Sequence, residues 1–85
     1  MTFRVELSRR AFDSLKKLDT PYKERITDKL KELEKTPFPR GCRKLRGEVD
    51  VYRLRLGKIR ILYKILWDEK TIIVFKIEPR EKIYG

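Results

Sequence analysis

Residues 52–63 read YRLRLGKIRILY, and they contain two runs in which apolar and basic side chains alternate. The two runs meet at Gly57-Lys58. A period of two predicts strands with one buried face, and a glycine in a two-residue loop between such runs predicts a β-hairpin. In this register the apolar and aromatic residues pair on one face: Leu56 with Ile59, Leu54 with Ile61, and Tyr52 with Tyr63. The hairpin therefore has a core face and an opposite, basic face.

The basic face of the predicted hairpin places Arg55 directly opposite Arg60, and Arg53 opposite Leu62. Like charges in that position destabilise a sheet by some tenths of a kcal/mol up to about 1 kcal/mol. A bound anion would offset the repulsion, and forked guanidinium groups match the oxygens of a phosphate well. The pattern therefore favours an anion-binding surface. It leaves open a solvated face whose arginines splay into water, and it does not distinguish RNA from DNA or from an acidic protein.

A third strand is predicted at Thr71–Glu78, after a turn at residues 68–70. A three-residue turn pairs Arg60 with Glu78, Ile61 with Ile77, Leu62 with Lys76 and Tyr63 with Phe75. Ile73, Phe75 and Ile77 would then face the core. Three aromatic residues fall on the apolar face of their strands and are predicted to be buried: Tyr52, Tyr63 and Trp67.

The N-terminal half predicts one strand and two helices. Phe3–Leu7 alternates apolar and charged residues, which suits a short strand, and Ser8 is a good N-cap for a helix over Arg9–Leu18. A second helix is predicted to start at Thr20-Pro21 and to end before Pro37. Its apolar stripe consists of Tyr22, Ile26, Leu30 and Leu33. The order β-α-α-β-β-β predicts an α+β fold with two N-terminal helices on one face of a small antiparallel sheet.

The composition limits the class of protein. The chain has 85 residues, which suits one small domain, and we expect residues 1–85 to form it. Its one cysteine excludes an internal disulfide, and its lack of histidine removes Ser-His-Asp and Cys-His catalysis and ordinary zinc sites. No run approaches about 18 apolar residues and the N-terminus lacks a signal-peptide pattern, so we expect a cytoplasmic protein without a membrane partner.

The positive charge is concentrated in the middle of the chain. The net charge is +10, and residues 40–64 hold nine basic and only two acidic side chains. Such an excess is typical of a protein that binds a polyanion, either nucleic acid or an acidic protein.

Three stretches of this sequence resemble the RelE-type toxins of the RelE/ParE toxin–antitoxin superfamily. They are Lys44–Gly47 (KLRG), Tyr52–Tyr63 and Pro79–Tyr84. The resemblance implies a RelE-like fold and the toxin of a type II toxin–antitoxin system. It implies an endonuclease that enters the ribosomal A site, contacts rRNA and cuts the mRNA codon there, which inhibits translation. The implied chemistry is attack of the ribose 2′-OH on the adjacent phosphate, without metal or cofactor, and the implied partner is an acidic RelB-like antitoxin in a hetero-oligomeric complex.

The resemblance also assigns roles to residues. It implies that Arg60 stabilises charge on the scissile phosphate, that Arg80 lies near the leaving 5′ oxygen, and that Tyr84 stacks on a base and assists proton transfer. Arg53 and Arg55 occupy positions where well-studied members carry lysines. Because arginine does not deprotonate, these two could only bind and polarise, and the base would be Tyr84, a lysine such as Lys58, or a ribosomal group. Contacts with RNA and the ribosome are expected from Lys44, Arg46, Lys58, Lys64, Lys76 and Lys82.

Two other functions remain open on the sequence. One is a ParE-like toxin that binds gyrase without cutting RNA. The other is a non-catalytic basic module that binds nucleic acid or protein.

Overall fold

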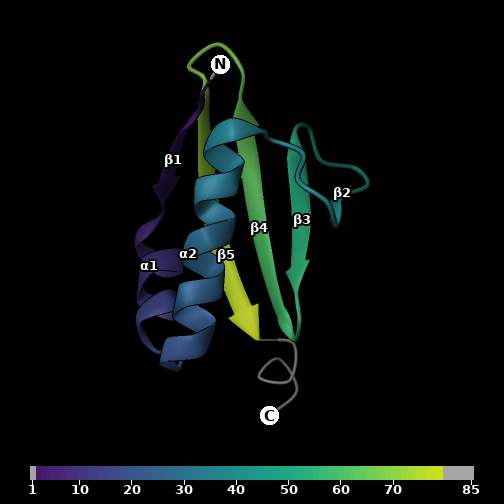
Figure 1. Cartoon of the computed structure of the whole chain (residues 1–85). Coiled ribbons are helices and arrows are strands. Elements are labelled where there is room, and N and C mark those ends of the chain that lie inside the picture. Colours follow the sequence, from purple (N-terminus) through teal and green to yellow (C-terminus); the bar gives the residue numbers. More distant parts are fainter. Residues whose placement is uncertain (1, 80–85) are drawn as a thin grey trace.

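The computed structural model describes residues 2–79, and these form a five-stranded sheet with two helices on one face (Figure 1). The elements are β1 (Arg4–Leu7), α1 (Arg9–Lys16), α2 (Thr20–Lys35), β2 (Cys42–Lys44), β3 (Val51–Leu56), β4 (Ile59–Leu66) and β5 (Thr71–Pro79). The strand order is β1-β5-β4-β3-β2. This arrangement confirms the α+β class and the position of the helices. It adds β2, which the sequence did not predict, and it pairs β1 in parallel with β5, whereas the other neighbours are antiparallel.

The two helices begin close to where the sequence predicts. The Ser8 hydroxyl caps α1 by accepting a hydrogen bond from the Ala11 backbone N–H at 3.1 Å. Asp19 is the N-cap of α2, and Pro21 lies in the first turn, where its missing N–H costs nothing. Helix α1 ends two residues before the predicted Leu18. Neither helix within residues 2–79 is long and apolar enough to cross a membrane.

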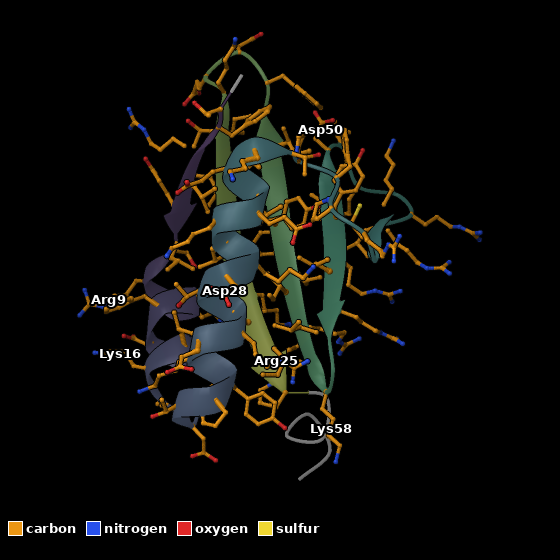
Figure 2. All side chains as sticks on the ribbon, viewed as in Figure 1. Arg9, Lys16, Arg25, Asp28, Asp50 and Lys58 are labelled. Atoms are coloured by element: carbon orange, nitrogen blue, oxygen red, sulfur yellow. The ribbon has the colours of Figure 1, made fainter. Side chains whose placement is uncertain are left out.

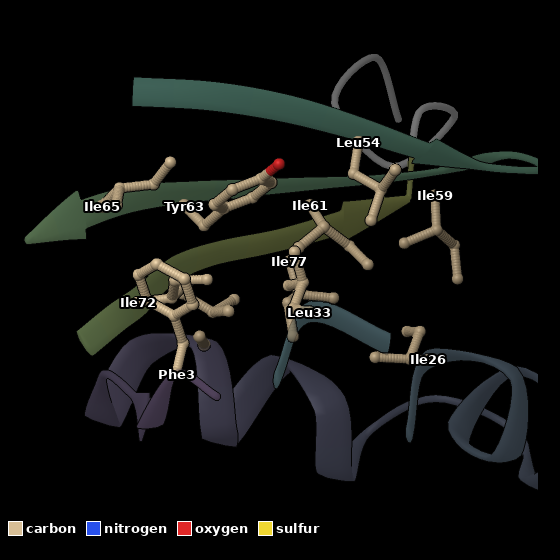
Figure 3. Close-up of a cluster of buried hydrophobic side chains, with 12 residues drawn as sticks. Phe3, Ile26, Leu33, Leu54, Ile59, Ile61, Tyr63, Ile65, Ile72 and Ile77 are labelled. Atoms are coloured by element: carbon tan, nitrogen blue, oxygen red, sulfur yellow. The ribbon is translucent and has the colours of Figure 1, made fainter. Parts of the chain in front are cut away.

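The hydrophobic core lies between the helices and the sheet (Figure 3). Ile26 and Leu33 of α2 are fully buried against Leu54, Ile61 and other residues of the sheet. Tyr63 is also fully buried, and its hydroxyl donates a hydrogen bond of 2.7 Å to the Pro37 carbonyl. Burial, and secondarily the neighbouring Cys42, raises the pKa of Tyr63, so the phenol stays neutral over the physiological range.

The β3–β4 hairpin has the predicted register at every pair, but the β4–β5 ladder does not. Arg60 pairs with Glu78, Ile61 with Ile77 and Leu62 with Lys76, as predicted. The register then shifts between Leu62 and Tyr63, so Tyr63 pairs with Val74 and not with Phe75. The extra residue of this β-bulge reverses which side chains face the core. Ile72 and Val74 are therefore fully buried, and the prediction that Ile73 and Phe75 face the core is wrong, whereas Ile77 is buried as predicted.

The predicted burial of the three aromatic residues holds for Tyr63, in part for Tyr52, and fails for Trp67. Tyr52 is half-buried and stacks on Tyr63 with ring centroids 5.8 Å apart. Trp67 is 46% exposed, because it follows the last residue of β4 and lies in the turn before β5. Its ring makes a T-shaped contact with the ring of Phe3, and its indole N–H donates a hydrogen bond of 3.2 Å to Oδ1 of Asp50.

Candidate nucleic-acid interface

The face of the sheet that is turned away from the helices, here named the outer face, gathers four arginines from three strands. Arg55 of β3 pairs with Arg60 of β4, and Arg53 of β3 pairs with Arg43 of β2. Cross-strand partners point to the same side of a sheet, so the two pairs lie side by side. We name Arg43, Arg53, Arg55 and Arg60 the arginine cluster. Nitrogen-tipped side chains project from β2 and β3 away from the helices (Figure 2).

The arginine cluster is electrostatically unfavourable for the protein alone. Burial and then the charges of Arg55, Arg43 and Arg60 lower the pKa of Arg53. Arginine nevertheless keeps its proton at neutral pH, so the repulsion is not relieved by deprotonation. An anion bound among these groups would relieve it.

Two guanidinium nitrogens of the cluster have no hydrogen-bond acceptor within the described part of the chain. They are Nε of Arg53 and Nε of Arg60, and both atoms are shielded from solvent. Buried donors are nearly always paired in folded proteins, because an unpaired one loses its hydration without compensation. A phosphate oxygen is a suitable acceptor for such N–H groups, since Arg–phosphate hydrogen bonds are charge-assisted.

One carboxylate lies among these cations. Nη2 of Arg60 donates to Oε1 of Glu78 at 3.1 Å, and Nζ of Lys76 lies 3.5 Å from Oε2 of the same carboxylate. The side chain of Glu78 is only 22% exposed. Glu78 therefore joins β4 and β5 at the edge of the arginine cluster, as the register of Arg60 and Glu78 predicted.

The structure brings some of the predicted binding lysines to the outer face and separates others from it. Lys76 lies on the outer face through its pairing with Leu62, and Lys64 is exposed on the same face. Lys44 pairs with Tyr52, whose ring packs on the core, so Lys44 lies on the helix side of the sheet. Lys58 lies in the turn of the β3–β4 hairpin (Figure 2).

The remaining predicted residues lie in a loop or outside the described residues. Arg46 is exposed in the loop between β2 and β3. Arg80, Lys82 and Tyr84 lie outside the described residues, so their predicted roles stay predictions.

Two members of the site were not among the predicted site residues. Arg43 belongs to a strand of only three residues, which is too short to show an alternating pattern. Glu78 was correctly placed opposite Arg60, but it was not assigned to the site. The signal for both is the register itself: each lies directly across from a predicted arginine.

Comparison with known proteins places this chain in a family. A model of the family described as "ParE toxin of type II toxin-antitoxin system, parDE" matches residues 5–84. A RelE1 toxin of Methanocaldococcus jannaschii is 36% identical over 87 residues, which span 99% of this chain and 97% of that protein.

Solved structures of toxin–antitoxin complexes contain chains with the same fold. A chain of the archaeal RelE–RelB complex from Pyrococcus horikoshii matches with a TM-score of 0.84 and 34% identity, over 94% of this chain and 97% of its own. The intact E. coli RelBE toxin–antitoxin complex contains a chain with the same fold, at a TM-score of 0.81 and 24% identity, over 91% of this chain and 95% of its own.

The chain belongs to the family of type II toxin–antitoxin toxins that this family model defines. Within it, the chain is a RelE-type toxin, as the sequence resemblance predicted.

Proposed function

We propose that this toxin is an endoribonuclease that cleaves mRNA in the A site of the ribosome and so inhibits translation. The observation that carries the proposal is the arginine cluster, in which the shielded Nε atoms of Arg53 and Arg60 have no acceptor among the described residues. Groups of this kind can hold a phosphodiester and can stabilise the charge that develops on it during attack by the ribose 2′-OH. The reaction would leave a 2′,3′-cyclic phosphate and a 5′-OH.

The roles of the side chains follow from their positions and from the family. Arg60 would bind the non-bridging oxygens of the scissile phosphate, and Arg53 and Arg55 would hold and polarise the neighbouring backbone. Arg80 near the leaving oxygen and Tyr84 stacked on a base are carried over from the resemblance alone. Because the chain has no histidine, proton transfer and charge stabilisation fall to arginine, lysine, tyrosine and carboxylate groups, and we propose that no metal ion takes part.

The proposed partner is an acidic RelB-like antitoxin. The structural relatives from P. horikoshii and E. coli were solved as RelE–RelB or RelBE complexes. The net charge of +10 makes the toxin complementary to an acidic segment. Such complementarity speeds association, and the binding weakens as the salt concentration rises. We place the toxin in the cytoplasm, where it would meet mRNA and rRNA on the ribosome.

Primer extension on translated mRNA after induction of the toxin tests the proposal. We expect cuts within codons that disappear in Arg60→Ala and persist in Arg10→Ala, which removes an exposed arginine of α1. Intact mRNA together with defects in DNA supercoiling would instead support a ParE-like toxin that binds gyrase. Normal growth with neither effect would support a non-catalytic basic module.

A further inference from the structure

We propose that the carboxylate of Glu78 is the general base that takes the proton from the attacking ribose 2′-OH. This inference rests on the proposed function, because it assigns one step of the proposed cleavage. It answers the question that the arginines at positions 53 and 55 raise, since neither guanidinium can accept a proton.

The position of Glu78 carries the inference. Its carboxylate receives a hydrogen bond of 3.1 Å from Nη2 of Arg60, and Nζ of Lys76 lies 3.5 Å from its second oxygen. The side chain is only 22% exposed. The contacts with the two cations hold its carboxylate in a defined orientation. A carboxylate oriented in this way lies beside the group that is proposed to bind the scissile phosphate.

Arg60 can serve the base and the phosphate at the same time. Its Nη2 contacts Glu78, whereas its Nε is shielded from solvent and has no acceptor among residues 2–79. A phosphate oxygen on Nε would leave the pair with Glu78 intact. The two acceptors would then lie on neighbouring donors of one planar guanidinium, which brings the carboxylate close to the ribose next to the bound phosphate.

A carboxylate is otherwise a poor choice at this position. It repels an RNA backbone and lowers the affinity of the outer face for anions. A surface that only had to bind RNA would be better served by a neutral residue opposite Arg60. A base that accepts a proton during the reaction explains why a negative charge is kept there.

The O–H bond of the 2′-hydroxyl breaks and its proton moves to a carboxylate oxygen of Glu78, while the 2′ oxygen forms a bond to phosphorus. The bond from phosphorus to the 5′ oxygen breaks, and the leaving oxygen takes a proton from water. Glu78 afterwards releases its proton to solvent.

Several charged or titratable groups surround Glu78. Arg60 faces it from β4, Lys76 from β5, and Arg55 lies across from Arg60 on β3. One cavity at the hairpin end of the sheet is lined by Glu78 together with Lys58 of the hairpin turn and with Lys17, Asp19 and Tyr22 of the helical layer. Most of these groups are cationic.

Single-turnover cleavage of mRNA on a programmed ribosome tests the inference with Glu78→Gln. We expect the cleavage rate to fall by roughly 10²- to 10⁴-fold, the usual contribution of a positioned general base. We expect binding of a non-cleavable 2′-O-methyl mRNA to stay equal or to become tighter, because a negative charge is lost. Hydroxide must replace the missing base, so the logarithm of the rate should rise with pH with a slope near one, whereas the wild-type profile stays flatter.

The controls separate this inference from the proposed function. Glu24→Gln removes an exposed carboxylate of α2 and should leave rate and profile unchanged. Glu78→Asp keeps a carboxylate and should cleave more slowly with the wild-type pH profile, and it replaces Glu78→Gln if that variant does not fold. Wild-type protein that does not cleave contradicts the proposed function. Wild-type protein that cleaves, with Glu78→Gln equally fast or with Glu78→Asp following hydroxide, overturns the role of Glu78 alone.

Discussion

Arg55 and Arg60 lie directly opposite each other across the β3–β4 hairpin, on the face of the sheet that the helices leave uncovered. The pair sits beside Arg43 and Arg53, so the like charges are not isolated. Among the described residues, Glu78 is the only acidic residue that forms an ion pair with these arginines, and its partner is Arg60. The protein thus keeps an unfavourable arrangement that an anionic ligand would stabilise.

Neutralising one member of this pair should therefore increase stability and reduce function. Arg55→Gln keeps most of the side-chain length but removes the charge, and we expect the free energy of unfolding to rise by some tenths of a kcal/mol up to about 1 kcal/mol at low salt. The gain should shrink as salt screens the repulsion. Urea denaturation at two salt concentrations measures it, and cleavage of ribosome-bound mRNA should slow in the same variant. Arg10→Gln, on α1, is the control. If Arg55→Gln changes the free energy of unfolding no more than Arg10→Gln does, the pair is not repulsive.

The Ser8 cap should contribute measurably to stability. Ser8→Ala removes the acceptor of the Ala11 N–H, and we expect a loss of about 1 kcal/mol in the free energy of unfolding. Ser14→Ala makes the same chemical change inside α1 and should be near neutral. Thermal or urea unfolding of the two variants checks the difference, and equal losses would contradict the capping role.

Tyr63 should make stability depend on pH in the alkaline range. Its pKa is raised in the folded state, chiefly by burial, so the folded protein keeps a proton that the unfolded chain loses above about pH 10. The stabilisation is complete below that pH and declines as pH rises further.

We expect Tyr63→Phe to lose about 1 kcal/mol at neutral pH, because the hydrogen bond to the Pro37 carbonyl is removed. The difference from wild type should shrink above about pH 10, since phenylalanine does not ionise. Urea denaturation across this pH range measures the difference. A gap that stays constant with pH would mean that Tyr63 ionises equally in both states.

The hairpin of β3 and β4 could be predicted in full because its information is local. A two-residue turn at Gly57-Lys58 fixes the register, and strict alternation on both sides fixes the faces. The β5 strand lacks this clarity, because Ile72, Ile73, Val74 and Phe75 are all apolar and either pair could face the core. The bulge buries Ile72 and Val74, and no feature of the β5 sequence marks its position.

A residue of the candidate site could be predicted only where the register of its strand could be predicted. Arg53, Arg55 and Arg60 followed from the hairpin, and the contact of Arg60 with Glu78 followed from the turn after β4. Arg43 was missed, since β2 is held by pairing with β3 and not by a pattern of its own. Lys44 was predicted to be in the site but lies on the helix side of the sheet. Its charge alone does not tell which face of an edge strand it occupies.

We propose that the arginine cluster holds the phosphates of an RNA strand. The most direct measurement is the affinity of single-stranded 2′-O-methyl RNA at several salt concentrations, for wild type, for Arg53→Gln/Arg55→Gln, and for the charge-matched control Arg9→Gln/Arg10→Gln on α1. We predict that the slope of log affinity against log salt becomes shallower by about 0.7 for each lost phosphate contact in the first variant only. Equal slopes in the two double variants would contradict the claim.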